Sequence, residues 1–243
     1  MRSTKWRFFS CWLIIVGLLC PPVVAADVPL LRQGHRGPEV VVLQDLLASL
    51  GYLSGEVDGI FGPNTKRSVV NFQKDEGLVS DGIVGVQTWR RLQAKAPVRD
   101  PELVLWEEVD LLFPHGSAAT IVDLVTGRSL QVRRYHGHLH ADVEPLTAAD
   151  TKVLKSLYGG CFSWERRAVA LEIGGRRIAA SMNGFPHGSG SINNNGFSGH
   201  FCVHFLGSRL HLDGTMHRSH QEKVLEAAGY SDSPLWFQGD RTR

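Results

Sequence analysis

The chain has 243 residues, of which 43% are hydrophobic and 21% are charged, and its formal net charge is +2. This length suits one or two domains that each bury a core of their own. The near balance of 26 basic and 24 acidic side chains gives no electrostatic reason to expect a nucleic-acid partner.

The N-terminus predicts an export signal over residues 1–26. A short basic stretch precedes an apolar run that ends at Leu19, and small residues stand directly before Asp27. This order is typical of a secretory signal peptide, cleaved here after Ala26. Cleavage would remove three basic side chains and leave 23 of them against 24 acidic ones, a net charge close to −1. We therefore expect an exported protein that is extracellular, periplasmic or associated with the cell wall.

The exported chain would retain two cysteines and no membrane span. No later stretch approaches the roughly 20 apolar residues that a span needs, so no stable span is expected after cleavage. Of the four cysteines only Cys161 and Cys202 would remain. Two cysteines are too few for a disulfide scaffold, and the sequence leaves open whether they are free thiols or form one bridge.

Residues 34–93 contain an internal repeat with the pattern D-G-I-x-G-x-x-T. It occurs at 58–65 and again at 81–88. Asp-Gly favours a tight turn, and the threonine that closes each copy, Thr65 or Thr88, is expected to cap the helix that follows. Apolar residues at helical spacing precede each copy and follow the second, which predicts three helices with two glycine-rich connections.

This module resembles the peptidoglycan-binding domain that many cell-wall hydrolases and transpeptidases carry. The matching residues, in chain order, are Gly34, Gly37, Leu43-Gln44, Gly51-Tyr52, the first copy of the repeat, Phe72-Gln73, Gly77-Leu78 and the second copy ending in Thr88-Trp89. The resemblance implies a small all-α, three-helix module over residues 27–93 that binds the glycan or the stem peptide of peptidoglycan. Tyr52, Asp58 and Asp81 are its candidate ligand contacts.

A linker is predicted at residues 94–101. This stretch holds two prolines and is crossed by no long apolar pattern, as expected of a short and fairly stiff spacer. The remaining residues, 102–243, are expected to form a second domain.

The second domain is predicted to be β-rich. Apolar residues alternate with period two in two hairpins, at 120–133 and 168–181, the latter with a Gly-Gly turn. Helices are expected only at about 148–158 and about 219–228. This pattern indicates an α+β domain.

The segment 198–205, Ser-Gly-His-Phe-Cys-Val-His-Phe, carries the strongest chemical signal. In a strand, His200, Cys202 and His204 would face one way, and three apolar side chains would face the other. A thiol between imidazoles is either a nucleophile whose proton a histidine accepts or a metal ligand. A buried structural cysteine is the third interpretation.

His187-Gly188 stands 15 residues before Cys202, across a Gly/Ser/Asn-rich loop at 189–196. Such a loop can fold back over a strand, which makes His187 the candidate base for Cys202. The order H-G, loop, S-G-H-F-C-V-H-F resembles the active-site segment of the L,D-transpeptidases, in which H-G is followed by S-H-G-C-[IV]-R.

The resemblance implies roles for individual residues. Cys202 would attack a carbonyl of a stem peptide, and His187 would accept the thiol proton. His200 and the backbone N–H groups around Phe201 and Cys202 would stabilise the oxyanion. Supporting roles are implied for Gly188, Ser198 and His204.

This chain departs from the family pattern at the cysteine. One extra residue precedes Cys202, Phe201 replaces a glycine, and His204 replaces an arginine. A titratable ring at that position cannot reproduce the fixed, bidentate charge of a guanidinium. The second domain therefore resembles a divergent L,D-transpeptidase. The cysteine mechanism needs no cofactor.

Two other interpretations remain open. In the first, the second domain is a zinc-dependent murein peptidase with Glu144 as base, because histidines two residues apart on a strand can converge on one ion. Its candidate ligands are His138, His140, Asp142, His200 and His204. In the second, the protein binds peptidoglycan without catalysis. The sequence does not decide between transpeptidation and hydrolysis.

Overall fold

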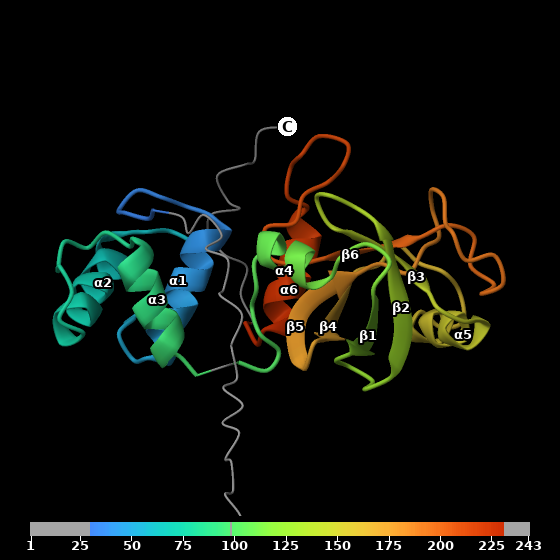
Figure 1. The fold of residues 1–243 in the computed structure, drawn as a ribbon, viewed down its shortest axis with the longest axis horizontal. Helices are drawn as coiled ribbons and strands as arrows, with labels where there is room; N and C mark the ends of the chain where they lie inside the picture. The colour runs from blue at the N-terminus through green and yellow to red at the C-terminus, as the bar shows by residue number, and fades with distance from the viewer. Residues whose placement is uncertain (1–29, 98, 231–243) are drawn as a thin grey trace, which may run out of the picture.

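A computed structural model describes residues 30–97 and 99–230 (Figure 1). The predicted signal peptide lies outside these residues. A helical module comes first, and a closed β-barrel with helices packed against it follows (Figure 1).

Three helices make up the first module: α1 (Pro38–Ser49), α2 (Pro63–Asp75) and α3 (Val86–Lys95). Proline at the start of α1 and α2 suits the first helical turn, where its missing N–H costs nothing. The helices bury a shared core that includes Leu43, Leu47, Phe72, Trp89 and Leu92. Because every buried member of this core lies between residues 31 and 92, the module has a core of its own.

A buried glutamine holds each copy of the repeated turn. The amide nitrogen of Gln44 on α1 lies 2.7 Å from Oδ1 of Asp58 and 3.1 Å from the carbonyl oxygen of Ile60. The N–H of Gly59 donates to Oε1 of the same glutamine at 2.7 Å. Gln73 on α2 holds the second copy through the equivalent atoms of Asp81, Ile83 and Gly82. The sequence repeat is therefore a repeat of one hydrogen-bonded clamp.

The expectation that Thr65 and Thr88 cap helices is wrong. The N-caps of α2 and α3 are Gly62 and Gly85, and neither helix start has a side-chain cap bond. Both threonines lie inside the first helical turn, and each Oγ1 is within 3.2 Å of the amide nitrogen of its clamp glutamine. The two hydroxyls expected to cap the helices thus accept hydrogen bonds from the glutamines instead.

The chain reaches the barrel through an extended stretch and a short helix. Glu102 joins the sheet edge, since its N–H donates to the carbonyl of Arg177 and its carbonyl accepts from the N–H of Ala179. Helix α4 (Trp106–Leu112) follows, and the sequence does not predict it. At 3.6 residues per turn, seven residues make fewer than two full turns, and only two of them are buried. The helix is therefore too short for a helical period of apolar residues to be recognised in the sequence.

Six antiparallel strands close the barrel in the order β1-β2-β3-β6-β5-β4. Their bounds are β1 Ala118–Asp123, β2 Ser129–His136, β3 Ala141–Pro145, β4 Arg167–Ile173, β5 Arg176–Met182 and β6 Phe201–His204. The pairing of β3 with β6 sets Asp142 opposite Cys202.

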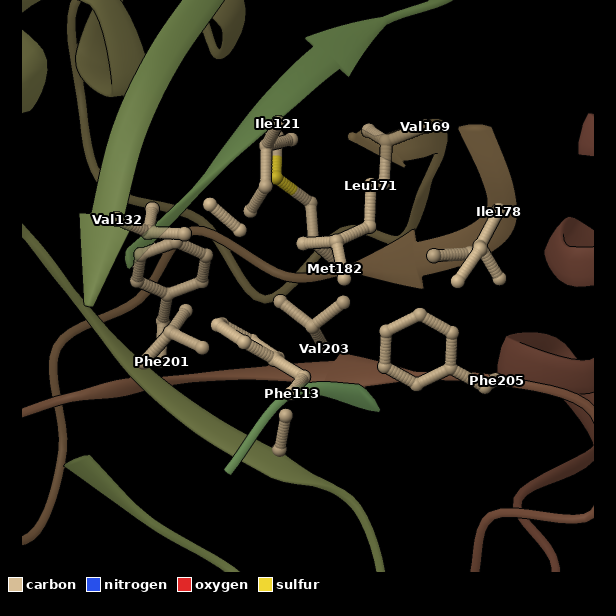
Figure 2. Close-up of a cluster of buried hydrophobic side chains, with 14 of the residues drawn as sticks. Phe113, Ile121, Val132, Val169, Leu171, Ile178, Met182, Phe201, Val203 and Phe205 are labelled. Carbon is tan, nitrogen blue, oxygen red and sulfur yellow. The ribbon is translucent and has the colours of Figure 1, made fainter. Parts of the chain in front are cut away.

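Apolar side chains from every strand fill the interior of the barrel (Figure 2). Helix α5 (Ala148–Leu157) packs on β2 and β3, and α6 (Arg218–Ala227) packs on β4 and β5. Helix α5 begins at a capping box, in which Thr147 and Asp150 each bond the backbone of the other. Both helices and both hairpins lie where the sequence places them, to within a few residues.

Among residues 30–97 and 99–230, no helix is both long enough and apolar enough to cross a membrane.

Replacing Gln44 with alanine should destabilise the first module. The change leaves the buried N–H of Gly59 without an acceptor and removes the donor for Asp58 and Ile60, a loss of about 3 kcal/mol in the free energy of unfolding. Urea unfolding of the fragment 27–96 measures it. Gln93→Ala, an exposed glutamine on α3, is the control, and equal stability of the two variants would refute the clamp.

Candidate active site

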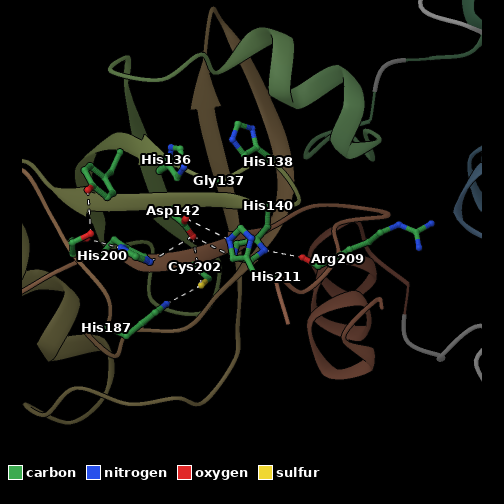
Figure 3. A network of polar contacts seen from close by, with 12 residues as sticks. His136, Gly137, His138, His140, Asp142, His187, His200, Cys202, Arg209 and His211 are labelled. Atoms are coloured by element: carbon green, nitrogen blue, oxygen red, sulfur yellow. Dashed lines mark hydrogen bonds and ion pairs between the residues drawn. The ribbon is translucent and has the colours of Figure 1, made fainter. Parts of the chain in front are cut away.

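Cys202 lies on β6 with the core on one side and a polar cleft on the other. Phe201 and Val203, its neighbours in sequence, are fully buried in the barrel core (Figure 2). The thiol points to the opposite side, toward a group of histidines and one aspartate (Figure 3). The side chain is 9% exposed, so the sulfur is largely shielded but borders the cleft.

The loop before β6 returns His187 to this thiol. Its Nε2 lies 3.1 Å from Sγ of Cys202, and its Nδ1 lies 2.9 Å from the carbonyl oxygen of Phe185. A carbonyl only accepts, so Nδ1 carries the proton and Nε2 presents its lone pair to the thiol. This is the tautomer that a base for Cys202 requires.

Two glycines allow the close approach of the His187 and His200 segments. The main chains of these histidines exchange two N–H···O bonds, each of 3.0 Å. A Cβ on Gly199 would lie 2.3 Å from the carbonyl oxygen of His187, and one on Gly188 would lie 2.5 Å from the ring of His200. Side chains larger than hydrogen would therefore push the base away from the thiol.

His200 lines the cleft beside the base. Its ring meets that of His187 edge to face at 4.6 Å between centroids, and its Nδ1 lies 2.6 Å from the carbonyl oxygen of Ser189. Its Nε2 is 3.7 Å from Oδ1 of Asp142. Its main-chain N–H already donates to His187, so only the ring can act on a substrate.

Asp142 and His140 complete the surroundings of the thiol. Asp142 on β3 is 3% exposed, and its Oδ1 is 3.2 Å from Nε2 of His140 and 3.9 Å from Sγ of Cys202. His140 is 2% exposed, and its Nδ1 lies 2.7 Å from the carbonyl oxygen of Arg209. That carbonyl keeps a proton on Nδ1 and leaves Nε2 facing the carboxylate and the thiol (Figure 3).

These contacts shift the acid–base equilibria of the cleft. Burial alone would lower the pKa of His140, but Asp142 and Cys202 outweigh it and raise that pKa to about 10. Burial alone would raise the pKa of Cys202, but the nearby ring of His140 and the hydrogen bond with His187 lower it below its ordinary value. The hydrogen bond with Cys202 raises the pKa of His187. The cleft thus favours a thiolate among imidazolium rings.

His204 is part of a buried stack of rings. It lies between His140, at 4.2 Å, and His220, at 3.8 Å, with nearly parallel planes. Burial lowers its pKa well below the ordinary value, and its Nδ1 has no hydrogen-bond partner. His204 is therefore a neutral ring behind the cleft, and it carries none of the charge of the arginine expected by resemblance.

Within the part of the chain that the structure describes, two groups of three side chains bring metal-ligating atoms within 4.8 Å of one another. They are His140 with Cys202 and His204, and His140 with Asp142 and His211. Of the five candidate zinc ligands, His140, Asp142 and His200 line the cleft and His204 lies behind it. His138 lies apart, against the rings of His115 and His136 (Figure 3).

The loop after His187 is organised by Glu144. This fully buried carboxylate accepts hydrogen bonds from the N–H groups of Ser191 and Ile192 and from the Ser191 hydroxyl. Burial alone would raise its pKa, but these bonds lower it. The loop borders a hollow of about 460 Å³, on which the exposed residue Ser198 lies. Glu144 thus holds the loop in shape and has no free oxygen directed at the thiol.

The candidate ligand contacts of the first module differ in what their polar groups do. The carboxylates of Asp58 and Asp81 accept bonds from Gln44 and Gln73 and from backbone N–H groups of their own turns. The hydroxyl of Tyr52 donates to Asp75 at 3.0 Å near the surface. Of the three, Tyr52 is the one whose polar group lies outside the clamps.

The sequence singles out His140 and Asp142 only as zinc ligands, and it does not identify His211. The pairing of β3 with β6 places the first two at the thiol, and Nε2 of His211 lies 3.5 Å from Oδ2 of Asp142. The signal for His140 and Asp142 is their spacing of two on a strand. No comparable signal exists for His211. Cys161 and Cys202 are both free thiols.

Cys202 should alkylate at a lower pH than an ordinary thiol. Because the pKa of Cys202 is lowered, the thiolate should form at a pH below about 8.5, the pKa that is usual for cysteine. His187→Ala removes one cause, so it should move the midpoint upward and slow alkylation at pH 7 several-fold. Peptide-mapped iodoacetamide kinetics against pH provide the measurement.

This experiment contains its own controls. The exposed thiol of Cys161 should react at the same rate in every variant. His115→Ala, at an exposed histidine outside the cleft, should leave Cys202 unchanged. A Cys202 rate that is indifferent to His187→Ala would exclude His187 as the base.

Comparison with known proteins assigns the first module. Residues 36–92 match the family described as "Putative peptidoglycan binding domain". An uncharacterized protein of Kitasatospora aureofaciens is 48% identical over 65 residues, which cover 26% of this chain and 55% of that protein. The spore cortex-lytic enzyme of Bacillus cereus is 33% identical over 85 residues, which cover 35% of this chain and 33% of the enzyme. The chain thus spans about half or less of the length of these relatives.

A solved L,D-transpeptidase from Xylanimonas cellulosilytica is similar over more of the chain. The similarity covers 77% of this chain and 89% of that one, at 23% identity and a TM-score of 0.27. A likeness this distant does not assign an activity. The family match does assign the module: residues 36–92 are a peptidoglycan-binding domain of that family.

Proposed function

We propose that this is an exported protein of the cell wall that binds peptidoglycan and acts on its stem peptides by cysteine acyl transfer. In this proposal residues 1–26 are the export signal, residues 27–93 the peptidoglycan-binding module, residues 94–101 the linker and residues 102–243 the catalytic domain. The contact of 3.1 Å between Nε2 of His187 and Sγ of Cys202 supports the catalytic part of the proposal.

The first half of the reaction forms a thioester. The thiolate of Cys202 attacks a carbonyl carbon of the stem peptide, and the carbonyl electrons move onto oxygen. When the tetrahedral intermediate collapses, the carbon–nitrogen bond breaks, and the imidazolium of His187 gives its proton to the departing amine. The peptide fragment remains attached to sulfur.

The second half returns the enzyme to its starting state. An amine or a water molecule gives a proton to His187 and attacks the thioester carbon, and the carbon–sulfur bond breaks to restore the thiolate. An amine acceptor yields a cross-link, and water yields a shortened stem peptide. His140 and Asp142 are positioning residues in this scheme, because they hold charge beside the sulfur without touching substrate.

The negative charge that develops on the carbonyl oxygen needs donors at the cleft. The ring of His200 borders the cleft, with Nδ1 committed to the Ser189 carbonyl. Its Nε2, which faces Asp142 at 3.7 Å, can donate to an oxyanion only when the ring is protonated on both nitrogens, and N–H groups near Cys202 are the other candidate donors. The reaction needs no cofactor.

A zinc-dependent peptidase is the second candidate. The observation that favours it is the grouping of His140, Asp142 and His211, whose ligand atoms lie within 4.8 Å of one another. An imidazole–carboxylate–imidazole set is suitable chemistry for zinc, which would activate a bound water. In that case Cys202 would be dispensable for activity, and this difference separates the two candidates.

The fragment 27–96 should bind insoluble peptidoglycan on its own. Its core is self-contained, and its family match gives the reason to expect binding. Sedimentation with purified sacculi at moderate salt measures it. A folded helical domain of similar size and charge is the control, and a fragment that stays in the supernatant with the control would refute the assignment of ligand to this module.

The chain from Asp27 should convert purified muropeptides, and Cys202→Ala should abolish the conversion. Mass analysis of the products distinguishes a cross-link from a shortened stem. EDTA should leave the rate unchanged, whereas a zinc peptidase would lose activity with EDTA and keep it in Cys202→Ala. No conversion of any muropeptide by the wild-type chain would favour a binding protein without catalysis.

A further inference from the structure

Three histidines gather on the surface away from the thiol. His115 lies in the turn between α4 and β1, His136 is the last residue of β2, and His138 lies in the turn between β2 and β3. All three are exposed. Figure 3 shows His136 and His138 on the other side of β3 from Cys202. Neither the proposed reaction nor its zinc alternative uses this cluster as a unit.

The spacing of the three rings fits a single bound ion. Their centroids are 5.2 Å apart for His115 and His136, 5.7 Å for His115 and His138, and 5.0 Å for His136 and His138. With a zinc–nitrogen bond of about 2.0–2.1 Å and tetrahedral angles, three bound imidazoles would have centroids about 5 Å apart. The ring nitrogens do not converge as they stand, and Nε2 of His115 lies 3.4 Å from the carbonyl oxygen of Gly137. Because the rings are exposed, rotation about their side-chain bonds would turn the nitrogens toward one point when an ion binds.

A buried arginine fixes the backbone beneath the rings. Arg134 is 1% exposed, and its guanidinium donates to the carbonyl oxygens of His136, Gly137 and Phe113. One cation thus ties the turn that carries His136 to the segment that leads to His115. Oδ1 of Asp110 lies 2.5 Å from Nη2 of Arg134. The carboxylate thus balances the positive charge of the guanidinium when no metal ion is bound.

A hydrogen bond and a glycine fix the backbone at His138, the third proposed ligand. The indole N–H of Trp106 donates to the carbonyl of His138 at 3.0 Å. Between the two histidines, Gly137 has a φ of 100°, and a Cβ there would lie 2.0 Å from the carbonyl oxygen of His140. Only glycine allows this turn, and the turn keeps both imidazoles next to His115. The backbone of all three ligands is therefore in place before binding.

We propose that His115, His136 and His138 form a binding site for a divalent first-row transition ion such as Zn²⁺, separate from the catalytic cleft. Three neutral imidazoles are a suitable donor set for such ions, with water completing the coordination. The ion would join the α4–β1 turn to the β2–β3 turn. Its binding should therefore also raise the melting temperature, because the unfolded chain does not hold the three rings together.

Zinc titration of the chain from Asp27, without an affinity tag, tests the proposal by calorimetry at pH 7.5. One equivalent should bind, and His136→Asn should weaken binding about ten-fold or more. His115→Asn, in a separate turn, should do the same, so that a local folding defect at one position does not decide the result. Thermal melts with and without zinc should lose the zinc-dependent shift in both variants.

The cleft contains its own metal-ligating atoms, and His211→Asn is the matched control. This variant breaks the grouping with His140 and Asp142 and should leave binding at the surface unchanged. Binding that is lost in His211→Asn and kept in His136→Asn would place the ion in the cleft and overturn the proposal. No saturable binding by the wild-type chain would overturn it as well.

Discussion

The charge of Asp142 determines the chemistry of the cleft. This carboxylate is 3% exposed, and a buried charge is costly unless partners of opposite sign surround it. His140, His200 and His211 come from three segments of the chain, and each places a ring nitrogen within 3.7 Å of it. Burial alone would raise the pKa of Asp142, but these histidines, His140 first, lower it. The carboxylate in turn favours a proton on His140, and that cation favours the thiolate of Cys202.

The histidines of this domain differ in charge because they face different groups. His140 faces a carboxylate and a thiol, and its pKa is raised. His204 and His220 stack behind it without a carboxylate, and burial lowers the pKa of both, that of His220 to about 2. A second cation in the stack would repel His140 at 4.2 Å, so the neutral rings preserve the charge that the thiol needs. Composition alone, with its many histidines, cannot distinguish these roles.

The features that the sequence predicts are local, and those it misses come from distant pairing. The turn repeat, both hairpins and the alternation around Cys202 are patterns within a few residues of the chain. The approach of Asp142 to Cys202 joins positions 60 apart and depends on barrel closure. The residues of β3 alternate between apolar and polar, which would suggest that Asp142 and Glu144 face solvent, but all five residues are buried. Thr65 and Thr88 are plausible helix caps from local sequence, but each hydroxyl accepts a hydrogen bond from a glutamine on the preceding helix.

A contact between the two modules bears on how binding would assist the proposed reaction. Asp45 on α1 is 7% exposed. Its Oδ1 accepts a hydrogen bond from the hydroxyl of Tyr230 and lies 2.5 Å from Nε of Arg99, with which it forms an ion pair. The guanidinium of Arg99 also lies over the ring of Tyr230 at 5.0 Å. The linker and the segment that follows α6 thus both contact the peptidoglycan-binding domain. Attachment to the wall raises the local concentration of stem peptides only where the cleft can reach them. An orientation held by this contact would restrict that reach to one side of the anchored module, and the contact would then select which stem peptides meet Cys202 in the proposed reaction.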